Sequence, residues 1–103
     1  MAGEVLDVLR AWYAAQCNGD WEQEHGVTIG TLEDSGWQLR VDLVGTALAG
    51  VELPRDLTVR AEGDWVEAWS DGFTFNASGG VANLAELLAA FAGFAERSGV
   101  PAA

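Results

Sequence analysis

Near the N-terminus, apolar side chains recur every three or four residues between Gly3 and Cys17, with charged side chains between them. This spacing predicts an amphipathic helix. Asn18 and Gly19 follow, and both residue types tolerate the left-handed backbone common just beyond a helix end, so we expect the helix to stop there. Its apolar stripe, which includes Trp12, is expected to pack on a sheet.

The next two segments have the alternation of β-strands. In residues 37–43, apolar side chains beginning with Trp37 alternate strictly with polar ones, and residues 27–33 are β-like as well. Such alternation is typical of a strand with one buried face. The four residues 33–36 between the segments are turn formers, and Gly36 can supply a positive φ. The sequence therefore predicts an antiparallel hairpin with Trp37 in the core.

A second hairpin is predicted further along the chain. Residues 57–62 alternate again, and residues 65–70 regain β character after a two-residue turn. Phe73 and Phe75 indicate one further short strand. Residues 44–56 are interpreted as a connection, because glycines and a proline interrupt them.

The last periodic segment follows Asn83. Asn83 and Glu86 form a capping pattern before an apolar run at helical spacing, and Gly99 and Pro101 stand just beyond its end. The predicted order is helix, four to five strands in hairpins, helix (α-β-β-β-β-α). We therefore expect a single α+β domain over residues 1–103, with an antiparallel sheet covered on one face by both helices.

Acidic residues dominate the charge of the chain. Sixteen Asp and Glu residues stand against five basic residues, which gives a formal net charge of −11. Residues 18–36 and residues 61–96 contain no Arg or Lys. Negative charge of this density repels nucleic acid and anionic membranes and speeds encounter with a basic partner. Acidity that only maintains solubility is the alternative interpretation.

The sequence also bears on the compartment. No apolar run approaches the roughly 20 residues that a membrane helix needs, and residues 1–10 contain acids where a secretory signal would be basic. We therefore expect the protein in the cytoplasm. Cys17 is the only cysteine, so the chain alone can form neither an intramolecular disulfide nor a thiolate metal site. A packed, unreactive thiol is expected at this position.

Three carboxylates and the only imidazole lie close together after the first helix, at Asp20, Glu22, Glu24 and His25. Residues of these types can bind a metal ion or exchange protons. Their spacing matches no EF-hand loop, and no second His completes a site. Gly79-Gly80 before the last helix lacks the Lys of a phosphate-binding loop. No metal, cofactor or catalytic residue is therefore predicted, and the acidic segment is interpreted as solvated or facing a partner.

Five tryptophans are unusual in a chain of this length. Trp12 and Trp37 fall on the apolar sides of their predicted elements, and Trp65 and Trp69 share one strand face. Three or four of the five are therefore expected in the core. Trp21 stands in a loop between acids, where it either plugs the edge of the sheet or serves as an interface anchor.

Several short motifs, spread over most of the chain, resemble those of one known family. They are Trp12-Tyr13, Cys17-Asn18-Gly19-Asp20-Trp21-Glu22, Gly26-Val27, Thr31-Leu32, Gly36-Trp37, Val41-Asp42-Leu43, Gly45-Thr46, Leu48, Gly50, Gly79-Gly80 and Asn83-Leu84. This run is similar to the immunity protein 53 family. The chain departs from the family pattern at Gln23, where the pattern has His, and at His25, where it has Tyr. The resemblance therefore supports no role for the imidazole.

The resemblance implies an immunity protein of a bacterial polymorphic toxin system, which is a cytoplasmic antidote encoded beside its toxin. With the charge, it predicts a protein that is not an enzyme and that neutralises a cognate toxin domain by stoichiometric occlusion. The toxin domain is expected to be basic, and a nuclease fits this because nucleases hold phosphates with Lys and Arg. The predicted partner-binding residues are Asp20, Trp21, Glu22, Glu24, Glu33 and Asp34.

Two other functions remain open at the level of the sequence. One is a small metal-dependent hydrolase that uses Asp20, Glu22 and His25. The other is a homo-oligomeric structural module that buries its surplus aromatic surface against itself. A helix-sheet-helix fold alone does not choose between these functions.

Overall fold

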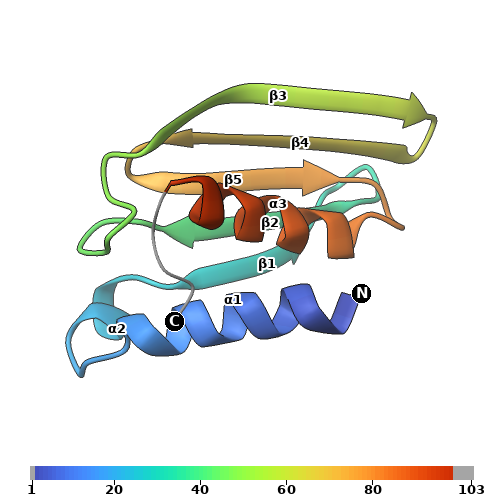
Figure 1. Cartoon of the computed structure of the whole chain (residues 1–103). Coiled ribbons are helices and arrows are strands. Elements are labelled where there is room, and N and C mark those ends of the chain that lie inside the picture. The colour runs from blue at the N-terminus through green and yellow to red at the C-terminus, as the bar shows by residue number, and fades with distance from the viewer. Residues whose placement is uncertain (1, 99–103) are drawn as a thin grey trace.

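The computed structural model describes residues 2–98 (Figure 1). The elements are α1 (Ala2–Gln16), α2 (Trp21–Glu24), β1 (Val27–Thr31), β2 (Trp37–Asp42), β3 (Glu52–Ala61), β4 (Asp64–Asp71), β5 (Thr74–Gly79) and α3 (Leu84–Arg97). The strands form one antiparallel sheet in the order β1-β2-β5-β4-β3. The predicted α+β class is confirmed, and so is an antiparallel sheet whose strands stand between an N-terminal and a C-terminal helix in chain order. Gly99 and Pro101, the predicted stop signals of the last helix, lie outside the described residues.

Three elements differ from the sequence-based prediction. β3 begins at Glu52, inside the segment interpreted as a connection, and runs through Pro54. A proline is tolerated there because β3 is an edge strand. β5 continues to Gly79 and is a central strand, and the loop around Trp21 contains the short helix α2.

The turn between β1 and β2 uses its glycine differently from the prediction. The positive φ, 68°, belongs to Ser35 and not to Gly36. A Cβ at Gly36 would lie 2.5 Å from the carbonyl oxygen of Gly79, so the position needs a glycine for space. Trp37, the first residue of β2, is half-buried, and its indole N–H donates to the carbonyl of Val81 over 2.9 Å. Trp37 therefore packs at the margin of the core instead of inside it.

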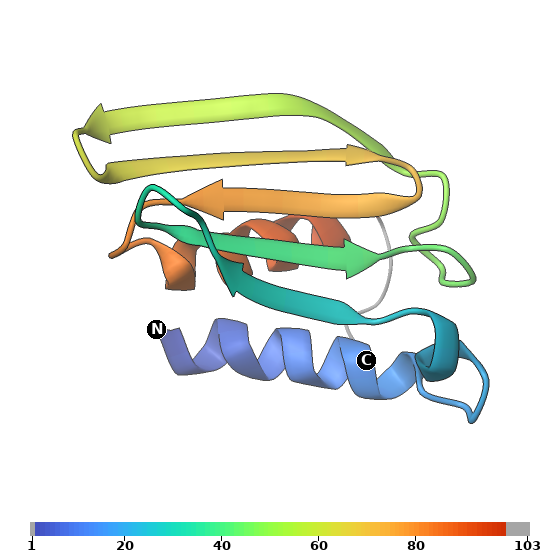
Figure 2. The ribbon, with the colours of Figure 1, turned by 180° about the vertical axis from the view of Figure 1, so that it is seen from behind.

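The core lies between the two long helices and one face of the sheet. α3 crosses this face and α1 lies beside α3, whereas the view from behind shows the face that neither helix covers (Figures 1 and 2). Leu39 and Val41 of β2 point toward the helices and are fully buried, as are Phe75 and Ala77 of β5. Phe91 of α3 packs edge-to-face on Phe75 at 5.4 Å.

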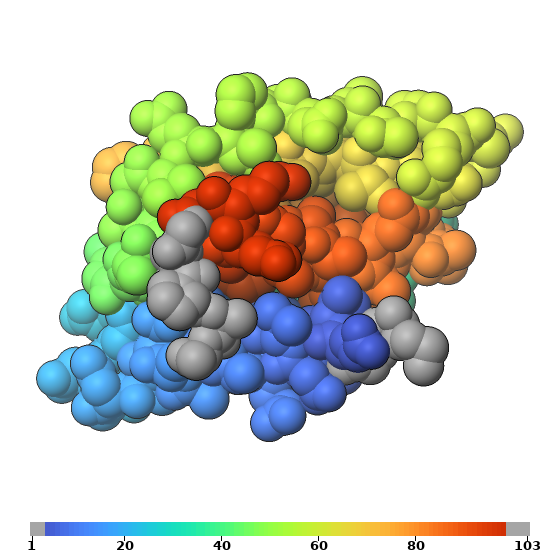
Figure 3. Space-filling view, viewed as in Figure 1, coloured from blue at the N-terminus to red at the C-terminus, as the bar shows by residue number. Residues whose placement is uncertain are grey.

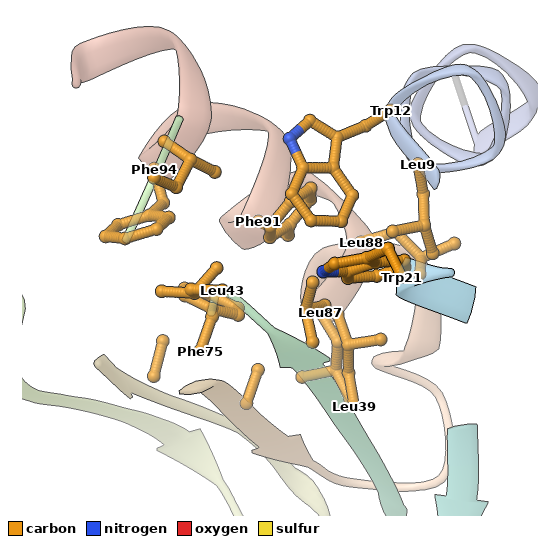
Figure 4. Packing of buried hydrophobic residues seen from close by; sticks show 14 residues of the cluster. Leu9, Trp12, Trp21, Leu39, Leu43, Phe75, Leu87, Leu88, Phe91 and Phe94 are labelled. Atoms are coloured by element: carbon orange, nitrogen blue, oxygen red, sulfur yellow. The ribbon is translucent and has the colours of Figure 1, made fainter. Parts of the chain in front are cut away.

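Trp12 packs against helices and not on a sheet, which corrects the prediction. Its ring makes edge-to-face contacts with Phe91 of α3 at 5.1 Å and with Trp21 of α2 at 6.1 Å (Figure 4). The reason is the position of α1, whose main neighbour is α3. The Trp12 ring of α1 therefore connects α1 to both α3 and α2.

A polar network joins the start of α3 to the β3–β4 hairpin. The buried Asn83 amide donates to Asp64 over 3.0 Å and to Glu86 over 2.7 Å, and Arg60 pairs with both carboxylates. The start predicted for this helix is confirmed, but the Asn83 side chain caps no backbone amide of α3. Its hydrogen bonds instead fix the helix start to the hairpin.

Candidate protein-interaction surface

The Asn18–Glu22 motif is held together by its own hydrogen bonds. The Asn18 side-chain oxygen accepts from the amides of Asp20 at 2.9 Å and Trp21 at 3.0 Å. The Glu22 carboxylate accepts from the amides of Asn18 at 3.0 Å and Gly19 at 2.7 Å, and Gly19 takes a positive φ of 95°. Hydrogen bonds from its own amide and from those of Asn18 and Gly19 lower the pKa of Glu22. The carboxylate of Glu22 therefore has a structural role.

Trp21 belongs to the core. Its side chain is 7% exposed, and its ring lies edge-on to those of Trp12 and Tyr13. The indole N–H donates to the carbonyl of Val44 over 2.7 Å. Of the two roles considered for Trp21, this geometry supports the plug, because the ring offers little surface to a partner. The same hydrogen bond ties α2 to the β2–β3 loop.

Asp20 and Glu24 are the members of the acidic segment that remain free on the surface. Both are exposed and line a groove of about 460 Å³ between the end of α1 and the β2–β3 loop. His25 lies on the same groove, with its Nδ1 3.9 Å from a carboxylate oxygen of Asp42. A groove with two free carboxylates at its rim is suited to basic side chains of a partner.

This groove is part of a larger surface that we call the end surface. It comprises residues 17–26, 43–52 and 71–73, which lie together at one end of the molecule (Figure 3). The Leu43 amide donates to the carbonyl of Phe73 and the Gly50 amide to that of Gly72, each over 2.8 Å. The three segments contain no Arg or Lys and five carboxylates, namely those of Asp20, Glu22, Glu24, Glu52 and Asp71.

Glu33 and Asp34 lie away from the end surface. They occupy the turn between β1 and β2, at the opposite end of β1 from α2 (Figure 1). The six residues predicted to bind a partner therefore do not form one surface. Asp20 and Glu24 share a groove, Trp21 and Glu22 support it from within, and the turn acids stand apart.

A second exposed surface is the open face of the sheet, which the sequence-based reasoning placed in the core. Trp65 and Trp69 share one face of β4, as predicted. Ala68 precedes Trp69 in the strand and is buried in the core. Because successive strand residues point to opposite faces, both tryptophans point away from the core. Both rings are half-buried, and the guanidinium of Arg55 lies 4.0 Å from the Trp69 ring centroid. Leu57 of β3 is 54% exposed. The sequence carried no signal for this orientation, because the larger side chains of β4 are the ones that point outward.

Cys17 is exposed, so the prediction of a packed thiol is wrong. It is the first residue beyond α1, and its thiol donates to the carbonyl of Tyr13 over 3.4 Å. Among residues 2–98, no three His, Cys, Asp or Glu side chains are placed to hold a metal ion together. None of the helices in the same range is long and apolar enough to cross a membrane.

A comparison with protein families decides the family of the chain. The family model described as immunity protein 53 matches residues 6–96, which include α2, the whole sheet and nearly all of α3. The chain belongs to the immunity protein 53 family. No curated protein and no solved structure matches the chain. For this immunity protein 53 family member, the family indicates a protein that binds a toxin.

Proposed function

We propose that this protein is the cytoplasmic immunity protein of a bacterial polymorphic toxin system. It binds its cognate toxin domain one-to-one and covers the functional surface of that domain, so it acts by occlusion and not by catalysis. Membership of the immunity protein 53 family supports the class of function. The toxin domain is basic, and a nuclease is the class that best explains an inhibitor with a net charge of −11.

The end surface carries this proposal. It combines five carboxylates with segments that contain no Arg or Lys. Backbone hydrogen bonds join residues 43–52 to residues 71–73, and the Trp21 indole N–H joins α2 to the carbonyl of Val44. A fixed array of one sign of charge raises the association rate with an oppositely charged partner. Asp20 and Glu24 contribute most, because both are exposed and neither carboxylate is used by the fold.

No observation favours the two other functions. The hydrolase would need Glu22 as a ligand or proton carrier, but its carboxylate holds the Asn18–Gly19 backbone. The self-associating module would have to bring together two chains of formal charge −11, which repel each other. A toxin partner with the opposite charge has no such cost.

The test measures association with the toxin domain encoded beside this chain. Co-expression should restore growth, and titration should give one-to-one binding. In stopped-flow mixing, Asp20→Asn with Glu24→Gln should lower the association rate about tenfold at low salt, because two of the steering charges are removed. The difference should shrink at physiological ionic strength, where the Debye length is about 8 Å.

The chain offers a matched control for this experiment. Glu33→Gln with Asp34→Asn removes the same charge from the other end of β1 and should change the association rate by less than about twofold. Equal effects of the two double variants would mean that only net charge matters. A salt-independent association rate, or an acidic toxin domain, would contradict electrostatic steering altogether.

A further inference from the structure

Phe73 is exposed although its backbone is firmly held. The side chain is 67% exposed at the turn between β4 and β5. Its amide donates to the Asp71 carboxylate over 2.9 Å, and its carbonyl accepts from the amide of Leu43 over 2.8 Å. Gly72 before it takes a φ of 90° and lies against Gly50, where a Cβ would come within 3.2 Å of the Gly50 Cα. The fold thus fixes this turn while leaving its aromatic ring in water.

Val44 stands beside Phe73 on the same surface. It is 41% exposed, and both side chains line a groove of about 280 Å³ with Ala49. The Val44 backbone is held from below, because its carbonyl accepts from the Trp21 indole. Single exposed apolar side chains are common in soluble proteins. Two neighbouring ones on hydrogen-bonded loops around one groove form a preorganised contact, which binds with a smaller loss of conformational entropy.

The charges around this apolar pair specify the partner. Glu52 and Asp71 line the same groove, and the adjoining groove carries Asp20 and Glu24. Bonds from the amides of Phe73 and Thr74 lower the pKa of Asp71, so this carboxylate stays charged at neutral pH. The complement is an apolar recess bordered by Lys or Arg. A second copy of this chain would bring acid against acid and does not fit.

We propose that Phe73 and Val44 form the apolar anchor of the end surface and insert into a recess of the basic toxin domain. The proposal rests on the proposed function and adds a division of roles to it. The carboxylates raise the rate of encounter, and the apolar pair holds the complex once it has formed. Interface energy is commonly concentrated in a few central apolar or aromatic residues inside a polar rim.

The experiment uses the recombinant toxin domain encoded beside this chain and measures both rate constants by surface plasmon resonance. Phe73→Ala should raise Kd about 30-fold or more, the size of a typical hot spot. Nearly all of the change should lie in the dissociation rate. The urea midpoint should stay close to that of the parent protein, because the ring is mostly in water. Val44→Ala provides a second, smaller perturbation of the same kind.

Leu57→Ala is the matched control, because Leu57 is an exposed apolar residue on the open face of the sheet. It should leave both rate constants unchanged. Parent-like dissociation from Phe73→Ala and Val44→Ala would overturn the anchor, even if the charge variants behave as proposed. A larger loss from Leu57→Ala would overturn it in favour of the open face. Failure of the parent protein to bind the toxin domain would instead remove the proposed function itself.

Discussion

Replacing Trp21 by alanine distinguishes a core plug from an interface anchor. The indole is 7% exposed, packs on two aromatic rings and gives its N–H to Val44. Removing a large buried aromatic side chain leaves a cavity and costs about 3 to 5 kcal/mol. We expect Trp21→Ala to lower the free energy of unfolding by an amount in this range. A typical domain has a total stability of only about 5 to 15 kcal/mol, so the variant should be close to unfolding.

Two further variants separate packing from hydrogen bonding. Trp21→Phe keeps much of the ring contact but loses the indole N–H. Loss of this hydrogen bond should lower the free energy of unfolding by about 1 kcal/mol, in addition to the effect of the smaller ring on packing. Trp65→Ala removes the same residue type from the open face, where the ring is half-buried, and should cost clearly less than Trp21→Ala. Urea denaturation followed by far-ultraviolet circular dichroism measures all three without relying on tryptophan emission.

A stable Trp21→Ala variant would contradict the burial of this indole. A loss below about 1 kcal/mol would mean that the ring is not part of the core in solution. If that variant also failed to bind the toxin domain, Trp21 would be the interface anchor that the sequence left open. Equal losses for Trp21→Ala and Trp65→Ala would show that the Trp65 ring is as deeply buried in solution as the Trp21 ring.

Cys17 and the ion pairs of Arg60 lie at the surface, where their effects can be measured directly. Cys17 should react with a thiol reagent in the native protein about as fast as in urea, and Cys17→Ser should leave stability unchanged within about 0.5 kcal/mol. Slow labelling would show a packed thiol. Bonds from Arg60, then from the Asn83 amide, lower the pKa values of Asp64 and Glu86. Their contribution should be complete above about pH 4.5 and lost as the pH falls through the lowered values, so Arg60→Gln should flatten the acid limb of stability against pH.

The strands of the first hairpin could be predicted from the sequence because one face of β2 is buried and the other is wet. Leu39 and Val41 are fully buried while Arg40 between them is exposed, so the alternation in the sequence matches the alternation in space. The last helix was equally clear, because Phe91 and Phe94 follow its buried side. Local periodicity of this kind depends on few distant contacts, and it is the information that a single sequence carries.

The sequence could not show which face of β4 the helices cover. Trp65 and Trp69 alternate with smaller residues, and the aromatic face was the natural choice for the core. In the structure the small Ala68 is paired with Ala77 of β5, and both side chains are buried on the side that α3 covers. The choice depends on the space left under α3, which is a tertiary property. For the same reason Cys17 was misplaced, because the end of α1 relative to its neighbours decides its exposure.

The composition of the acidic groove could be predicted in part. Asp20 and Glu24 were identified from the base-free segment, and both line the groove of the end surface. Phe73 was missed as a surface residue because it shares a short aromatic run with Phe75, which is fully buried. The turn directs the Phe73 side chain outward because the Phe73 backbone is hydrogen-bonded to Asp71 and Leu43. These hydrogen bonds are known only from the structure.

The internal bonds of the Asn18–Glu22 motif have a consequence for the evolution of specificity. The side chains of Asn18 and Glu22 form hydrogen bonds within the loop itself, and the Trp21 ring packs in the core. A lineage can therefore keep this motif, and with it the scaffold, while Glu24, Phe73 and their neighbours change to follow a changing toxin. If the end surface binds the toxin as proposed, two chains that share the motif can have the same fold and still protect against different toxins.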